Sequence, residues 1–194
     1  RSAHADFYPL DSWSAAISTE NARPSIGGRR NYNILSLDVK GTKELGQTSQ
    51  VLAARIRGIG FYGYQNVRLT TPLSLLPRQT SIYYDSSFSQ LISGSFEYRI
   101  PITWDVGINV LGLYMEALTL GAFYDASITA ENSFTSDFNL GTNKINWTAG
   151  GLFRQRVLVF GRTFTVIEGS VYYDPLKSSN NWDYFITFAG QANF

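Results

Sequence analysis

The chain has 194 residues, of which 16% are charged and 15% aromatic, with 13 Phe, 12 Tyr and 17 Gly. Charged residues are scarcer than the roughly 25% of an average soluble domain, and a net charge of +1 without a basic stripe gives no case for nucleic acid as a partner. The chain has no Cys, which excludes thiolate chemistry and the commonest structural zinc sites. It has one His, His4, which excludes a His-based catalytic triad. No apolar run approaches the roughly 18 residues of a membrane helix.

Alternating apolar and polar residues recur in segments of about ten residues, and turn-rich stretches separate these segments. This is the spacing of tilted strands in a membrane β-barrel. The second segment shows it most clearly, because Leu35, Leu37 and Val39 alternate with polar residues. The sequence therefore predicts an all-β fold, a transmembrane antiparallel β-barrel, as one domain over residues 1–194. We expect about eight strands in this chain, at about Trp13 to Asn21, Tyr32 to Gly41, Val51 to Tyr62, Ser93 to Ile102, Ala117 to Ile128, Lys144 to Phe160, Thr163 to Tyr173 and Asp183 to Phe194.

The last segment ends the chain on Phe194, and its alternate positions Tyr184, Ile186 and Phe188 are also apolar. In a membrane barrel every second side chain of a strand faces lipid. A terminal Phe on that face resembles the C-terminal signal by which bacterial outer-membrane proteins are recognised for insertion. We therefore expect these four residues to form an insertion signal and outer-membrane lipid to surround the barrel. The alternative is an edge strand of a soluble sandwich that ends in Phe.

Two stretches between the segments lack alternation, Gly63 to Leu91 and Thr129 to Asn143. Loops beyond about 15 residues in a compact fold are usually functional or disordered. We expect both stretches to be external loops, and the longer one to contribute to the mechanism.

The polar faces of several segments carry charges that a barrel would turn towards its interior. Glu97 and Asp125 are the acidic candidates, and the basic candidates are Arg55, Arg57, Arg99, Arg154 and Arg156. One interpretation is a network of ion pairs that keeps a narrow barrel closed, since eight strands leave room only for side chains. The other interpretation is a role in transport. A catalytic pair of carboxylates would lack a companion nucleophile, so we expect no enzymatic activity and no cofactor.

Three short blocks, in this order, resemble a known family. They are Val51 to Gly58, the Glu-Tyr-Arg-Ile-Pro block within Phe96 to Ile102, and the Phe-Tyr-Asp block within Gly121 to Ala126, before a terminal aromatic strand. Together they resemble the C-terminal barrel half of the bacterial surface antigen superfamily, the outer-membrane barrels of the BamA, TamA and two-partner-secretion type. The resemblance covers nearly the whole chain. It implies a sixteen-stranded barrel of which this chain supplies the last half.

In that family a loop folds back into the barrel and places an Arg against acids on the two following strands. The resemblance assigns Glu97 and Asp125 to the acidic positions and makes Arg78 the candidate for the loop Arg. A guanidinium offers carboxylates a rigid fork of donors. Arg78 departs from the family's Arg-Gly-aromatic triplet, because Gln79 and Thr80 follow it. The arginines of the polar faces are therefore alternative partners for the two acids.

Two functional hypotheses follow. The first is a barrel in the bacterial outer membrane that helps insert or translocate proteins, with client or partner proteins of the outer membrane or periplasm. Its weak seam between first and last strands would let client strands pair by β-augmentation. The second is a small closed eight-stranded barrel with a structural or surface-interaction role and no transport activity. The chain begins with Arg1, so it is a processed form or the C-terminal piece of a longer protein, and we favour missing upstream strands and periplasmic domains.

Overall fold

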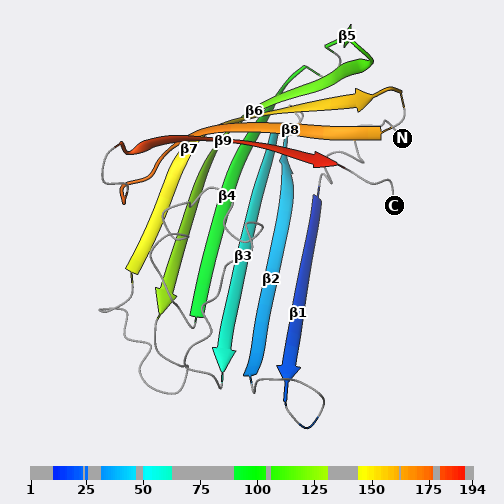
Figure 1. Cartoon of the computed structure of the whole chain (residues 1–194). Coiled ribbons are helices and arrows are strands. Elements are labelled where there is room, and N and C mark those ends of the chain that lie inside the picture. The colour runs from blue at the N-terminus through cyan, green and yellow to red at the C-terminus, as the bar shows by residue number, and fades with distance from the viewer. Residues whose placement is uncertain are drawn as a thin grey trace.

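A computed structural model gives the fold and describes residues 11–23, 25, 32–46, 50–62, 90–103, 106–130, 144–161, 163–176 and 180–190. The strands in these ranges form one nine-stranded antiparallel sheet (Figure 1). None of the described residues forms a helix long and apolar enough to cross a membrane. The strands are β1 (Asp11–Ala22), β2 (Tyr32–Leu45), β3 (Gln50–Tyr62), β4 (Gln90–Thr103), β5 (Ile108–Val110), β6 (Leu113–Ala130), β7 (Lys144–Val159), β8 (Thr163–Tyr173) and β9 (Trp182–Gly190).

The sheet has a simple meander order, β1-β2-β3-β4-β6-β7-β8-β9, and the short β5 pairs with β6. This arrangement confirms the predicted all-β antiparallel fold. No pairing joins β1 to β9 among the described residues, so the sheet is open and these two strands are its edges. Figure 1 shows the sheet curling strongly, with β8 and β9 crossing the view at a steep angle to β1, β2 and β3.

Several predicted boundaries are wrong. The strand β4 begins at Gln90 and not at Ser93, and β6 continues to Ala130, beyond the predicted start of a loop at Thr129. The strand β5 was not predicted, because three residues are too few to show alternation. What remains of the two predicted external loops, residues 63–89 and 131–143, lies outside the described residues.

Two tight turns lie at the same end of the sheet and contact each other. Leu111 and Gly112, between β5 and β6, have φ angles of 52° and 83°, and Phe160 and Gly161, after β7, have φ angles of 48° and 67°. The Phe160 N–H donates to the Gly112 carbonyl at 2.7 Å. Positive φ at both central residues matches the twist of a tight hairpin, but it strains a residue that has a Cβ, such as Leu or Phe.

The two faces of the curled sheet differ. We call the face that carries Phe123, Leu152 and Tyr172 the inner face, because these three side chains form a buried cluster against which Phe185 packs. The rings of Phe123 and Tyr172 lie 6.4 Å apart in an edge-on arrangement, although β6 and β8 are not neighbours. Contacts between non-neighbouring strands place this cluster on the concave side of the sheet. We call the opposite face the outer face.

A β-bulge interrupts the alternation in the middle of the sheet. The register between β6 and β7 shifts between Met115 and Leu118. Sequence alternation assigns Val157 to the apolar outer set, but the side chain is only 2% exposed and lies opposite Met115, next to this shift. Alternation along β7 therefore does not describe the burial of Val157. A bulge bends the strand and increases its local twist, and period-two alternation in the sequence does not predict that change.

Candidate functional site

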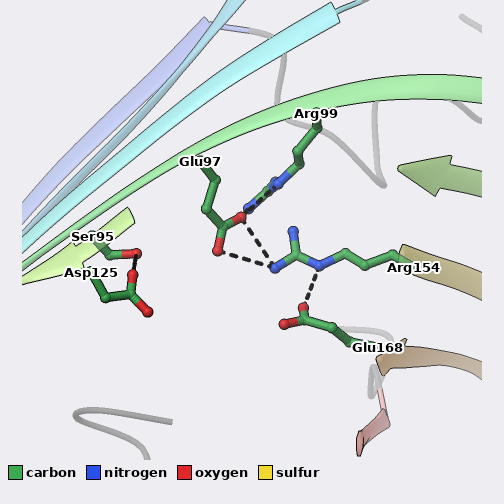
Figure 2. A network of polar contacts seen from close by, with 6 residues as sticks. All are labelled: Ser95, Glu97, Arg99, Asp125, Arg154 and Glu168. Carbon is green, nitrogen blue, oxygen red and sulfur yellow. Dashed lines mark hydrogen bonds and ion pairs between the residues drawn. The ribbon is translucent and has the colours of Figure 1, made fainter. Parts of the chain in front are cut away.

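Four charged side chains of the inner face contact one another (Figure 2). Arg99 Nε donates to Glu97 Oε2 at 2.8 Å, and the Arg99 Nη2 also contacts this oxygen. Arg154 Nη2 lies 3.3 Å from the same oxygen, while its Nε donates to Glu168. The four side chains are between 10% and 15% exposed. Two carboxylates and two guanidinium groups thus balance their charges in a largely buried cluster, which we call the central network.

The central network joins three strands because of their register. Glu97 and Arg99 are two residues apart on β4 and so share a face. Arg154 on β7 lies directly opposite Glu168 on β8. To reach Glu97, the Arg154 side chain must cross β6 near Gly121, where a Cβ would lie only 2.5 Å from the Tyr98 carbonyl oxygen. A glycine at this position allows close packing beneath the arginine.

A second ion cluster lies nearer the β1 edge. Asp38 on β2 accepts from Arg55 Nε at 2.8 Å, and Arg57 Nε lies 3.4 Å from its other carboxylate oxygen. The Arg55 and Asp38 side chains are 38% and 35% exposed. The Arg55–Asp38 pair is therefore more open to solvent than the central network, whereas the Arg57 side chain is 11% exposed.

A third pair lies beside the bulge. Arg156 Nε is 3.0 Å from Glu116 Oε2, and the guanidinium carbon lies 3.8 Å from the centre of the Phe164 ring. A cation over an aromatic face gains electrostatic stabilisation when it is desolvated.

The structure groups the predicted site residues differently from the resemblance. Asp125 is buried and accepts from the Ser95 hydroxyl at 2.5 Å, beside the central network but outside its contacts (Figure 2). Glu97 contacts Arg99 and Arg154, as two of the sequence-derived alternatives allow. The loop candidate Arg78 lies outside the described residues. Sequence reasoning did not select the acids that contact the other arginines, which are Asp38, Glu116 and Glu168.

The outer face carries large apolar side chains that remain exposed on each of the eight strands of the meander. A soluble sheet would place its apolar face inside and its charges outside, whereas the inner face here holds the ion pairs. The exposed apolar residues of the strands include Trp13, Ile17, Leu35, Leu37, Ile56, Ile92, Phe96, Ile100, Ile102, Leu120, Tyr124, Ile145, Phe153, Val171, Tyr184, Ile186 and Phe188.

Four aromatic rings on consecutive strands form a continuous row at one level of the sheet. Tyr124 on β6 stacks on Trp147 on β7 at 6.1 Å between centroids, Trp147 lies 5.9 Å from Tyr173 on β8, and Tyr173 lies 5.8 Å from Trp182 on β9. Such pairs add stabilisation beyond the area that they bury. We call these four residues the aromatic row.

The connections between strands are unequal at the two ends of the sheet. At the end near the aromatic row they span residues 23–31, 63–89, 131–143 and 174–181, and at the other end they span residues 46–49, 104–107, 111–112 and 160–162. The strand β9 ends at the side of the short connections, where β1 begins. The sheet therefore has one end with long connections and one with tight turns.

The predicted insertion signal is described in part. Tyr184, Ile186 and Phe188 on β9 are 74%, 58% and 70% exposed, and all three lie on the outer face at the sheet edge. Phe194 lies outside the described residues.

The chemistry of the described inner face is that of ion pairing. No group of three or more His, Asp or Glu side chains in the described ranges is arranged to hold a metal ion. Comparison with protein-family models, curated proteins and solved structures gives no match for this chain.

Proposed function

We propose that this chain forms the wall of a transmembrane β-barrel in a bacterial outer membrane, of the type that helps insert or translocate proteins. The observation that carries the membrane part of this proposal is the inverted polarity of the sheet. Its exposed outer face carries large apolar side chains on all eight strands of the meander, while buried charges occupy the inner face. In water such a surface would far exceed the apolar patches of ordinary monomers, whereas in a bilayer it faces hydrocarbon.

Two further features support this location. Membrane barrels carry aromatic girdles at the lipid–water interface, and the aromatic row fits that role. Outer-membrane barrels also combine short periplasmic turns with longer extracellular loops. By this rule the end of the sheet with the tight turns, where β9 ends, faces the periplasm, and the end with the long connections faces the outside.

The assembly or translocation role is supported by the family resemblance and by the open edges of the sheet. The described residues of β1 up to Asn21 are exposed on both faces. Unpaired backbone groups are not tolerated in hydrocarbon, so the β1 and β9 edges need further strands beside them. Strands of a longer barrel, or strands of a client that is being inserted, would satisfy these edges by β-augmentation.

A second candidate function is a closed eight-stranded barrel with a structural role, and the stagger of the sheet favours it. A line of directly paired residues, one on each strand, crosses the sheet from Asp11 at the start of β1 to Tyr184 near the start of β9. The residues between them on this line are Lys43, Leu52, Tyr98, Ala122, Gly151 and Val171. The starts of β1 and β9 lie at opposite ends of the sheet, so the sheet is sheared, as barrel closure requires. The two edge strands are also antiparallel to each other.

The experiment that tests the proposed function is depletion of the protein from its own cells, followed by measurement of how fast other outer-membrane barrels acquire heat-resistant gel mobility. We expect slower folding or lower levels of several clients. Unchanged levels and kinetics would contradict the assembly role.

Two measurements separate the two candidates. The intact mass of the protein from its own membrane should be well above 21.7 kDa if further strands complete the barrel, and near that value if it closes alone. Cysteines at Ile17 on β1 and, in turn, at Ile186 or Phe188 on β9 should form an intramolecular disulfide if the two edges pair, because all three residues lie on the outer face.

A further inference from the structure

Four oxygen-bearing side chains lie in one row across the inner face, on neighbouring strands. Ser95 on β4 is directly opposite Asp125 on β6, and Asp125 is opposite Thr148 on β7. Asp174 directly follows Tyr173, whose partner is Ala149, so the register of β7 and β8, continued by one residue, leads from Asp174 to Thr148. Directly opposite side chains have Cβ atoms about 4.5–5.5 Å apart. Thr148 is thus flanked by a carboxylate on each side.

Two atoms of this row lack hydrogen-bond partners. Thr148 and Asp174 are each 1% exposed, and Thr148 Oγ1 and Asp174 Oδ2 have no hydrogen bond. The other Asp174 oxygen accepts the Leu176 N–H at 3.0 Å, which fixes the carboxylate at the start of the turn. Within the described ranges no arginine or lysine forms an ion pair with Asp174.

This arrangement is costly as it stands. A buried carboxylate without a counter-charge is strongly unfavourable, and a buried hydroxyl without a partner adds to that cost. Thr148 could donate its single proton to either flanking carboxylate, but it donates to neither. A cation that accepts lone pairs from both atoms would remove both defects at once.

We infer that Asp174 Oδ2 and Thr148 Oγ1 bind a divalent cation, and that Ca²⁺ is the ion that fits this site. Carboxylate and hydroxyl oxygens are hard ligands, which excludes a preference for soft transition metals. Ca²⁺ takes six to eight oxygens in a flexible geometry, whereas Mg²⁺ demands a near-ideal octahedron. The Ser127 hydroxyl, two residues after Asp125 on β6, is 1% exposed and also lacks a hydrogen bond, and it is a further candidate ligand.

The expected affinity is low. The site offers one carboxylate and few other side-chain oxygens, against the six to eight oxygens that Ca²⁺ prefers, so the dissociation constant belongs in the range of about 10⁻⁴ to 10⁻³ M that extracellular calcium modules show. The site lies at the end of the sheet with the long connections, next to the turn after β8. It depends on the register of β6, β7 and β8 and not on the proposed function.

The test is titration of the refolded full chain with Tb³⁺ after treatment with a chelator. Tyr172, two residues before Asp174 on the same face and 0% exposed, should sensitise terbium luminescence. We expect saturable luminescence that millimolar Ca²⁺ displaces and that equal Mg²⁺ displaces at least tenfold less well. Absence of saturable luminescence, or equal displacement by the two ions, would overturn the inference.

Matched variants locate the ion. Thr148→Val removes the hydroxyl without changing the side-chain shape, and it should weaken Ca²⁺ competition at least tenfold, as should Asp174→Asn. Ser170→Ala removes another buried, unpartnered hydroxyl on the inner face of β8, opposite Leu152, and should leave the competition unchanged. If Thr148→Val and Ser170→Ala behave alike, a buried water or an empty space, and not a cation, lies beside Thr148.

Discussion

Arg154 is the residue whose replacement should destabilise the sheet most clearly, because it contacts two carboxylates from two different strands. Its Nη2 lies 3.3 Å from Glu97 Oε2, and its Nε donates to Glu168. The substitution Arg154→Met keeps most of the aliphatic stem and removes the charge. Arg99 would still contact Glu97, but the guanidinium that neutralises Glu168 would be lost.

The magnitude follows from the burial of the central network. Removing one partner of a buried ion pair costs about 3–5 kcal/mol, because the other charge stays buried. The side chains here retain 10% to 15% exposure, so we expect the lower end, about 3 kcal/mol. Arg55→Met is the matched control: its side chain is 38% exposed and that of Asp38 is 35% exposed. Exposed pairs of this kind contribute about 0–1 kcal/mol.

The assay is equilibrium urea unfolding of the two variants in lipid vesicles, read by the shift in gel mobility between folded and unfolded protein. The double variant Arg154→Met with Glu168→Gln adds a check, because it also removes the carboxylate charge that Arg154 contacts and should recover about 0.5–3 kcal/mol relative to the sum of the single changes. If Arg154→Met costs no more than Arg55→Met, the central network does not stabilise the sheet, and the reasoning from burial is refuted.

Three further predictions concern other parts of the sheet. Asp125→Asn should lower the free energy of unfolding by about 1.5–3 kcal/mol through loss of a charge-assisted hydrogen bond, and an unchanged heat-modified mobility would contradict this. Gly169→Ala should raise the susceptibility of β8 to proteolysis, because a Cβ at this position would lie 2.1 Å from the Phe153 ring. Resistance to proteolysis equal to that of the unchanged chain would show that the ring moves away freely. Leu120→Arg on the outer face should lower the free energy of unfolding in vesicles by about 2–4 kcal/mol if the residue faces the bilayer centre. Leu111→Arg at the tight turn should lower it by about 0–1 kcal/mol. Equal effects of the two substitutions would argue against lipid at the outer face.

The strands could be predicted from the sequence where alternation is regular. Phe96 and Ile100 are exposed on β4, and Glu97 between them is buried, as period-two patterning indicates. The same pattern failed at Val157, since a bulge in the neighbouring strand changes the local geometry. It also missed β5, whose three residues lie between Gly107 and Gly112.

The partners of the arginines could not be predicted, because they depend on register between strands. Alternation can assign an acid to a polar face, but it cannot say that Arg55 lies beside Asp38 or that Arg154 lies opposite Glu168. Register is set by turn geometry and by which face is buried, and a shift of two residues would preserve every face while changing every pair. Glu116 gave no signal, since it lies at the bulge itself.

The central claim is that the outer face contacts lipid, and the most direct measurement is the environment of spin labels on the two faces in vesicles. Labels would replace Phe96 and Leu120 on the outer face and Ser14 on the inner face of β1, all of which are exposed. We predict that molecular oxygen relaxes the labels at positions 96 and 120 strongly and that a water-soluble nickel complex does not, with the reverse at position 14. Equal access of the nickel complex to all three positions would contradict the membrane assignment.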